Sequence, residues 1–301
     1  MEVDIGHHVP NFHVRRPTAD LVADVERADL AFLAAGLTTV CDAQVTRREL
    51  RAYQEARRSG RLRVRTVCMP LSHQLPELEA LGLGSGFGDD RLSLGAMKFY
   101  AGGSIIGGTA RFSEPYGADH EFTGSSYWEP EAFVDSVVRA HRAGCQIGVH
   151  AQGDEGIALA LTAFEAAQAA APSADPRFRL EHAGGPTDAQ VAQMAGLDVI
   201  TVNQPSYLYG SGDDFLVRFG ARAARLQPWR SELDAGIRVV VSSDSDVASF
   251  RPMDTIAAAL TRTTRGGQPI GVEQALTLDE AVRAHTIDAA FALRLEDRLG
   301  S

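Results

Sequence analysis

Apolar runs of strand length alternate with amphipathic or charged segments of helix length along most of this chain, and this alternation restricts the folds it can adopt. Runs rich in β-branched and apolar residues predict seven strands, at residues 37–41, 62–69, 94–100, 145–150, 178–182, 198–203 and 237–242. Helical patterns occupy residues 18–35, 47–58, 75–81, 130–143, 155–171, 187–195, 252–262 and 278–293, and two short helices are expected between the last two strands. Strands that alternate with helices pair in parallel through right-handed crossovers. The sequence therefore predicts an α/β fold.

The length of the repeating unit distinguishes between the common parallel α/β folds. A (β/α)8 barrel uses roughly 31 residues per unit, because about 250 residues make eight units. No glycine-rich dinucleotide-binding fingerprint follows the first predicted strand, which argues against a Rossmann-type sheet. Seven units are one short of a closed barrel. We therefore expect a (β/α)8 TIM-barrel type fold that lacks its first strand, with residues 1–16 as an N-terminal loop segment and residues 17–301 as a partial barrel.

Four residues that can bind a metal lie at or just after the ends of predicted strands: Lys98, His150, His182 and Asp244. The two histidines are 32 residues apart, which is one barrel unit, and Asp244 follows His182 by 62 residues, which is two units. In a barrel all four would lie at the C-terminal rim, where barrel active sites are found. Two imidazoles and a carboxylate suit a divalent metal such as zinc. Each residue alone also has an ordinary role, as a hydrogen-bonded core histidine or a capping aspartate.

Lys98 is the single lysine among 29 basic residues, so arginine carries every other basic charge. A buried lysine amine can lose its proton and react, whereas a guanidinium stays protonated. A lone lysine on a predicted core strand therefore indicates a role that arginine cannot fill. The alternative is a surface lysine whose stem packs while its amine reaches water.

Composition excludes several classes of function. The formal net charge of −10 argues against nucleic acid as a partner. No apolar stretch approaches the roughly 18 residues that cross a membrane. The three cysteines, Cys41, Cys68 and Cys145, lie in apolar runs and are expected to be reduced core thiols of a cytoplasmic protein.

Several phrases, in order along the chain, resemble the amidohydrolase superfamily, in particular the branch of the N-substituted formamide deformylases. They are KFYAGGS with a downstream EPY, GVHAQGDEG, RLEHAG, VNQPSY, SSDSDV with a following proline at Pro252, and LTLDEAVRAHTIDAA. The resemblance implies a metal-dependent hydrolase on a distorted (β/α)8 barrel. It also implies hydrolysis of an amide or other non-peptide C–N bond in a small molecule.

The resemblance assigns a role to each of the four strand-end residues. Lys98 matches the lysine that carbon dioxide converts to a carbamate bridging two divalent metals, so one or two ions, with zinc preferred, are implied. His150 and His182 match the two histidine ligands. Asp244 matches the aspartate that binds metal and shuttles a proton from and to the metal-activated water.

Weaker assignments follow for substrate binding. Residues 101–128 match a substrate-facing loop, and Tyr100, Tyr116 and Gln204 are candidate substrate contacts. For these three residues, ordinary packing or loop hydrogen bonding is the alternative.

The chain also departs from the family pattern. The His-x-His pair of the family's first strand is absent, and His7, His8 and His13 do not have that spacing. Neither half of the accessory β-sandwich is recognisable, so we expect a chain truncated at both ends. Two functions stay open: a metal-dependent amide hydrolase, or a catalytically inactive barrel acting as a binding or scaffold protein. An unpaired strand edge would favour self-association into a homo-oligomer.

Overall fold

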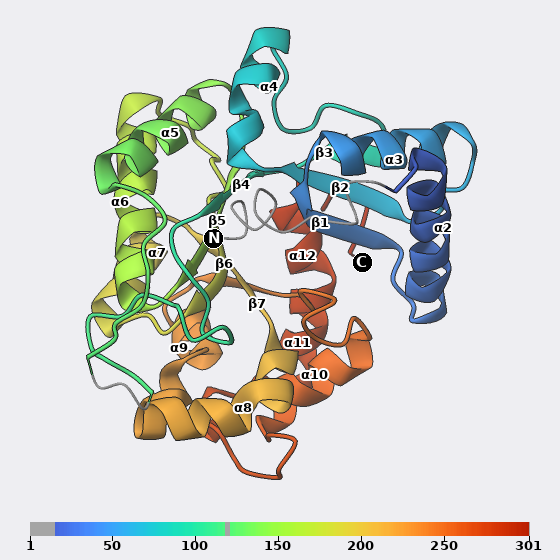
Figure 1. Cartoon of the computed structure of the whole chain (residues 1–301). Helices are drawn as coiled ribbons and strands as arrows, with labels where there is room; N and C mark the ends of the chain where they lie inside the picture. Colours follow the sequence, from blue (N-terminus) through green and yellow to red (C-terminus); the bar gives the residue numbers. More distant parts are fainter. Residues whose placement is uncertain (1–15, 118–120, 301) are drawn as a thin grey trace. The chain divides into compact units, whose positions relative to one another are not determined.

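The strands form two parallel sheets, and each sheet belongs to its own unit of the chain (Figure 1). The computed structural model describes residues 16–117 and 121–300, so the predicted N-terminal loop at residues 1–16 lies almost entirely outside the described residues. The first unit ends at Ala96 and the second begins at Met97. In the described part of the chain, no helix has both the length and the apolar character needed to cross a membrane.

The first unit is a three-stranded sheet in the order β1-β2-β3, with β1 at Thr39–Val45, β2 at Arg65–Pro70 and β3 at Leu92–Leu94. Its helices are α2 (Thr18–Ala34), α3 (Arg47–Arg58), the short 3-10 helix η2 (Ser72–Gln74) and α4 (Leu75–Leu81). A capping box starts α3. The Thr46 hydroxyl accepts a hydrogen bond from a backbone amide of the first turn, and the Glu49 carboxylate accepts one from the backbone amide of Thr46. The predicted helices at residues 47–58 and 75–81 are confirmed at both ends.

The second unit is a five-stranded sheet in which neighbours in sequence are neighbours in space. Its strands are β4 (Met97–Tyr100), β5 (Ile147–Gln152), β6 (Arg179–Gly184), β7 (Ile200–Asn203) and β8 (Arg238–Val241). Its α-helices are α5 (Pro130–Arg142), α6 (Asp154–Ala170), α7 (Asp188–Gly196), α8 (Pro205–Phe219), α9 (Trp229–Asp234), α10 (Pro252–Thr261), α11 (Leu278–His285) and α12 (Ile287–Ala292). Two 3-10 helices complete it, η3 (Gly220–Arg225) and η4 (Val272–Gln274).

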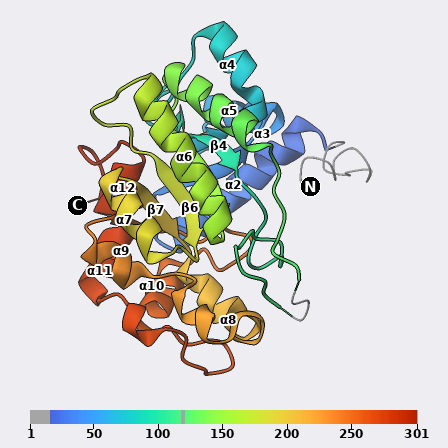
Figure 2. The same ribbon diagram turned by 90° about the vertical axis from the view of Figure 1, so that its left-hand side faces the viewer.

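The two faces of this sheet carry different residues. Strand register places Tyr100, His150 and Glu181 in one row, and their neighbours point to the opposite face. On that opposite face Phe99 meets Phe133 of α5 edge-on, and Figure 2 shows α5 and α6 side by side in front of the sheet. Lys98 shares the face of Tyr100, because the two are separated by one residue on the same strand. The candidate ligands of β4 and β5 are therefore directed away from α5.

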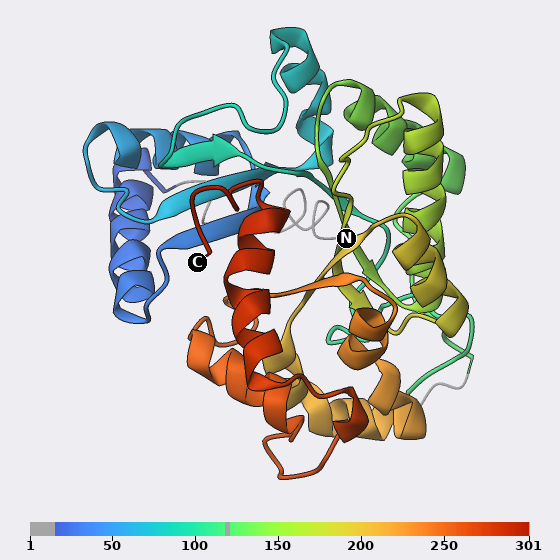
Figure 3. The same cartoon turned by 180° about the vertical axis from the view of Figure 1, so that it is seen from behind.

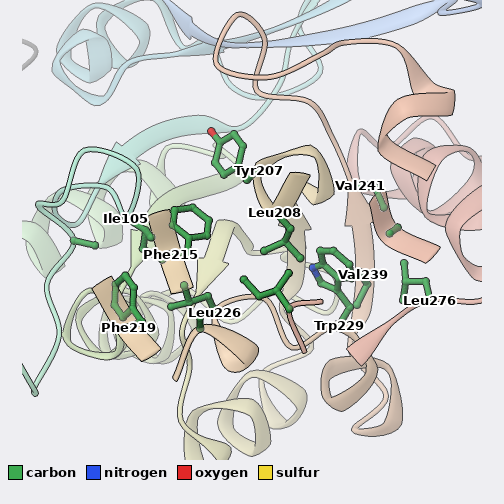
Figure 4. Packing of buried hydrophobic residues seen from close by; sticks show 14 of the residues in the cluster. Ile105, Tyr207, Leu208, Phe215, Phe219, Leu226, Trp229, Val239, Val241 and Leu276 are labelled. Carbon is green, nitrogen blue, oxygen red and sulfur yellow. The ribbon is translucent and has the colours of Figure 1, made fainter. Parts of the chain in front are cut away.

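Two packed regions hold the later strands in place. Residues of α12, drawn in red in Figure 3, pack against Ile200, Val202 and Val240 of β7 and β8. A larger core joins α8, the segment after it and β8, and Figure 4 shows Phe215, Trp229 and Val239 within it.

The predicted strand at residues 94–100 is wrong in one respect, because it is two strands. β3 ends at Leu94 and pairs with β2, whereas β4 begins at Met97 and pairs with β5. Gly95 lies at the break, and a Cβ atom there would be 2.5 Å from Cγ1 of Val67. Because the backbone of Gly95 lies so close to the Val67 side chain of β2, this position needs glycine, and β3 ends just before it. The described residues therefore hold eight strands, not seven.

Two helix predictions also differ from the structure. The expected single helix at residues 278–293 breaks at Thr286, whose φ of −119° and ψ of −94° are not helical. The first of the two expected short helices is the fifteen-residue α8, which continues through two glycines. At one of them, Gly212, a Cβ would lie 2.6 Å from Cγ2 of Thr264, so the glycine permits close packing within a helix.

The parallel α/β architecture predicted from the sequence is confirmed. The barrel is not closed, because the strands of residues 16–117 and 121–300 form sheets of three and five rather than one ring.

Candidate functional site

The structure brings three of the four predicted metal ligands together on adjacent strands. Lys98, His150 and His182 lie on β4, β5 and β6, and each is at most 6% exposed. The Lys98 Nζ atom is 4.9 Å from the ring centroid of Tyr100, and that ring lies 5.0 Å from the ring of His150. The rings of His150 and His182 are 4.5 Å apart at an interplanar angle of 74°. These contacts form a continuous chain from the lysine to the second histidine.

A bulge in β6 turns the second histidine toward the first. His150 pairs with Glu181, but Gln152 pairs with Gly184, so β6 has one more residue than β5 across this stretch. In a regular strand His182 would face away from Glu181, and hence away from His150. Instead His182 has a φ of 77° and Ala183 a φ of 46°. This conformation is costly for residues with a side chain, and such strain concentrates at functional sites.

Hydrogen bonds fix which nitrogen of each imidazole carries the proton. His150 Nε2 lies 3.0 Å from the carbonyl oxygen of Gly103, which can only accept, so Nε2–H donates and Nδ1 keeps its lone pair. His182 Nδ1 lies 2.6 Å from Oε1 of Gln204. The Gln204 amide nitrogen donates to the carbonyl of Val202 at 2.9 Å, which establishes that Oε1 accepts from His182. His182 therefore keeps its lone pair on Nε2.

Burial keeps both imidazoles neutral. Desolvation, together with the nearby His182 and Lys98, lowers the pKa of His150 well below its usual value. Desolvation and the charge of Lys98 lower the pKa of His182 to about 3. A neutral imidazole with one nitrogen held by an oxygen acceptor is the form that binds a divalent metal. The pair therefore offers two lone pairs from adjacent rings.

Asp244 lies three residues after β8 and is connected to the histidines through Tyr207 of α8. The Tyr207 hydroxyl donates to Oδ2 of Asp244, and its ring lies 6.1 Å from the ring of His182 with an interplanar angle of 16°. Burial and the charge of Asp244 raise the pKa of Tyr207, so its hydroxyl stays protonated. Sequence reasoning missed Tyr207, although the phrase VNQPSY places it in the first turn of the helix after β7.

The two remaining substrate-contact candidates have other partners in the structure. Gln204 is buried, and its amide group forms hydrogen bonds with His182, Val202 and Ser242. Tyr116 is also buried, stacks on Phe219 at 4.7 Å and donates to the Ala110 carbonyl at 2.7 Å. Their predicted contact with a substrate stays a prediction.

The predicted substrate loop is anchored to the end of β5. The backbone amide of Ile105 donates to Oε1 of Gln152 at 2.8 Å, and Nη1 of Arg218 donates to the Ile105 carbonyl at 3.1 Å. At Gly153, where φ is 85°, a Cβ atom would lie 2.0 Å from the carbonyl oxygen of Arg111. The part of the loop before residue 118 therefore packs directly on the strand that carries His150.

A cavity of about 1060 Å³ is lined in part by Ser245 and Asp246, the two residues that follow Asp244 in the chain. Its lining comes from four segments: the first half of α8, the loop after β8, α10 and the loop after α10. Tyr207 and Ser245 belong to this lining, and Ser245 directly follows Asp244 in the chain. The wall includes the large side chains of Tyr207, Tyr209, Val247, Phe250, Arg251 and Arg265 and the carboxylates of Asp246 and Asp254. The volume is that of a pocket for a small molecule.

The donor set fits a divalent metal in part. His150 and His182 have the protonation, burial and proximity that a metal site needs. Among the residues that the structure describes, however, no three histidine, cysteine, aspartate or glutamate side chains are grouped closely enough to hold an ion. Asp244 bonds to Tyr207 rather than joining the two rings.

Comparisons with known proteins identify the family and the fold of the chain. A family model described as the amidohydrolase family matches residues 8–301. The N-substituted formamide deformylase of Arthrobacter pascens is 30% identical over 271 residues, which are 87% of this chain and 49% of that protein. The crystal structure of an uncharacterized metal-dependent hydrolase from Pyrococcus horikoshii OT3 superposes with a TM-score of 0.84 and 25% identity, covering 95% of this chain and 58% of that one.

A more distant structure shows the same fold. Atrazine chlorohydrolase TrzN from Arthrobacter aurescens TC1, complexed with zinc, matches with a TM-score of 0.58 and 18% identity over 93% of this chain and 61% of that one. The chain spans about half the length of the formamide deformylase and less than two thirds of these structures.

Proposed function

This chain is a member of the amidohydrolase family, and on that premise we propose that it is a metal-dependent hydrolase of small molecules. Its reaction would be hydrolysis of an amide or another non-peptide C–N bond. The observation that carries the proposal is the pair of buried, neutral imidazoles of His150 and His182, 4.5 Å apart. The name of one relative, N-substituted formamide deformylase, indicates removal of a formyl group from an amide and supports this reaction class.

We assign His150, His182, Asp244 and Lys98 as the residues that would hold one or two divalent ions, with zinc favoured by this donor set. When bound, such an ion would lower the pKa of a coordinated water toward neutrality and would polarise the substrate carbonyl. Lys98 would take part as a carbamate. Its neutral amine nitrogen bonds to the carbon of carbon dioxide and one proton leaves, which gives an anionic oxygen ligand that arginine cannot form.

Other side chains would transfer the proton, orient a ligand and bind the substrate. Asp244 accepts a proton from the attacking water and delivers it to the leaving nitrogen, as a general base that becomes a general acid. Gln204 keeps His182 in one tautomer through the hydrogen bond to Nδ1. The cavity lined by Tyr207, the partner of Asp244, and by Ser245 would receive the small-molecule substrate. Tyr100, beside His150, and Tyr116 remain proposed substrate contacts.

One observation favours a second candidate, a catalytically inactive member of the family that acts as a binding or scaffold protein. It is the lack of a group of three metal-binding side chains within residues 16–117 and 121–300.

A hydrolysis assay separates the two candidates. Purified protein supplied with zinc and bicarbonate is incubated with a panel of N-formyl and N-acyl amines, and release of the free amine is measured. The hydrolase proposal expects turnover that Asp244→Asn abolishes and that Asp135→Asn, an exposed aspartate of α5, leaves intact. Equal background rates in all three proteins would support the inactive candidate.

A further inference from the structure

We propose that Tyr207 is a positioning residue that fixes the Asp244 carboxylate for metal binding, an inference that rests on the proposed function. Its hydroxyl holds the Oδ2 atom of Asp244. The other carboxylate oxygen, Oδ1, is then left for a metal or a proton. Nothing in the comparisons assigns a role to this tyrosine.

Asp244 needs such a partner because its own segment holds it weakly. It follows β8 in a loop, is half-buried and has a φ of 49°, while Ser245 and Asp246 after it are exposed. Within the described residues, the hydrogen bond from Tyr207 is the one that its carboxylate receives from another side chain. A carboxylate on a half-buried loop would otherwise sample several rotamers.

Tyr207 is itself held by the core around α8. It is 6% exposed and lies in the first turn of α8, next to Leu208, which is fully buried. Figure 4 shows Tyr207 at the edge of the core, with its hydroxyl directed away from Leu208 and Phe215. The rigid core therefore determines where the hydroxyl oxygen lies.

The same side chain contacts a second proposed ligand. Its ring lies nearly parallel to the His182 ring at 6.1 Å, while its hydroxyl reaches Asp244. Tyr207 thus sets the spacing between a ligand that follows β8 and a ligand of β6. Partners that orient metal ligands typically change metal affinity 10–100-fold when they are removed.

The test is a zinc titration of metal-free protein against a chelating dye. It compares the wild type, Tyr207→Phe, Asp244→Ala and the double variant. Phenylalanine keeps the ring against His182 and the core and removes only the hydroxyl. The matched control is Tyr53→Phe, which removes an equivalent hydrogen bond, 2.7 Å from the tyrosine hydroxyl to Oδ2 of Asp42, in the first unit. Thermal unfolding of each variant verifies folding.

We expect Tyr207→Phe to weaken zinc binding roughly tenfold or more and Tyr53→Phe to leave it unchanged. In the Asp244→Ala background, Tyr207→Phe should have no further effect, because the carboxylate through which it acts is gone. Wild-type affinity in Tyr207→Phe, together with weakened binding in Asp244→Ala, would overturn the inference and leave the proposed function standing. Unchanged binding in Asp244→Ala would contradict the proposed ligand set, and the inference with it.

Discussion

The imidazole rings of His150 and His182 lie 4.5 Å apart although the regular pairing of their strands would direct them to opposite faces of the sheet. The bulge at His182 and Ala183 brings them together, at the cost of two residues with positive φ. At these two residues the backbone of β6 departs from regular strand geometry and places both candidate ligands on one face. The predictions below test the contacts that hold this arrangement.

Removing the Gln204 amide should weaken metal binding without unfolding the protein. Gln204→Ala frees His182 to protonate either nitrogen, so zinc affinity should fall roughly 10–100-fold. Gln146→Ala is the matched control, because Gln146 is also buried and donates to the carbonyls of Arg177 and Ala292, at 2.8 and 3.1 Å, rather than to a proposed ligand. Equal zinc affinities of the two variants would show that the Gln204 contact does not orient the ligand.

The packing of the substrate loop on β5 predicts a difference between two glycines that both have positive φ. Gly153 and Gly144 have φ values of 85° and 81°, so alanine is strained at both. Only at Gly153 would the added Cβ meet another residue, 2.0 Å from the Arg111 carbonyl oxygen. Gly153→Ala should therefore lose about 1–3 kcal/mol more than Gly144→Ala in the free energy of unfolding. Equal losses in urea unfolding would mean that the loop does not rest on β5.

The buried ion pair of β6 should matter more than a pair at the surface. Arg179 Nε and Glu181 Oε1 are 2.8 Å apart, and both side chains are about 5% exposed. Glu181→Ala leaves the Arg179 charge buried and should cost about 3 kcal/mol or more in the free energy of unfolding. Glu114→Ala, which removes an exposed carboxylate 3.0 Å from Arg222, should cost less than about 1 kcal/mol. Similar losses in both variants would contradict the burial of the first pair.

Glu232 should make stability depend on pH. It is fully buried in α9, accepts from the Thr201 hydroxyl at 2.7 Å, and burial raises its pKa to about 7. An acid whose folded pKa is raised favours folding while it is protonated. Its contribution is complete below the unfolded pKa of 4.5 and is lost as pH rises toward 7.

The loss over that window is of the order of 3 kcal/mol, since one pKa unit corresponds to about 1.4 kcal/mol. Urea unfolding at several pH values measures it as the difference between the wild type and Glu232→Gln, which carries no titrating proton. A constant difference between pH 4.5 and 7 would show that Glu232 is ionised in the folded protein.

The elements of the fold could be predicted because each depends on local patterning. Helix α3 starts at a capping box and carries many charged residues around the buried Ala52 and Ala56, so its limits are visible in the sequence. The break between β3 and β4 could not be seen, since Gly95 is required only by its approach to Val67 across the sheet. Closure of a barrel likewise depends on pairing between distant strands rather than on any one of them.

For the site, the spacing of the strand-end residues predicted which ligands share one sheet, and Lys98, His150 and His182 do. The backbone conformation and the hydrogen bonds that orient these candidate ligands could not be predicted from the sequence. The bulge at His182 depends on backbone torsions, and the bond from Tyr207 to Asp244 joins residues 37 positions apart through space. Gln204 was predicted as a substrate contact, which stays a prediction, and its hydrogen bond to His182 could not be read from its motif.

The central claim is that His150 and His182 form a metal centre. The most direct measurement is a crystal structure of the protein grown with zinc and bicarbonate, with anomalous scattering recorded across the zinc absorption edge. We predict an anomalous peak at bonding distance, about 2.0–2.1 Å, from Nδ1 of His150 and Nε2 of His182. A structure whose anomalous peaks all lie away from these two nitrogens, or that has none, would contradict the account.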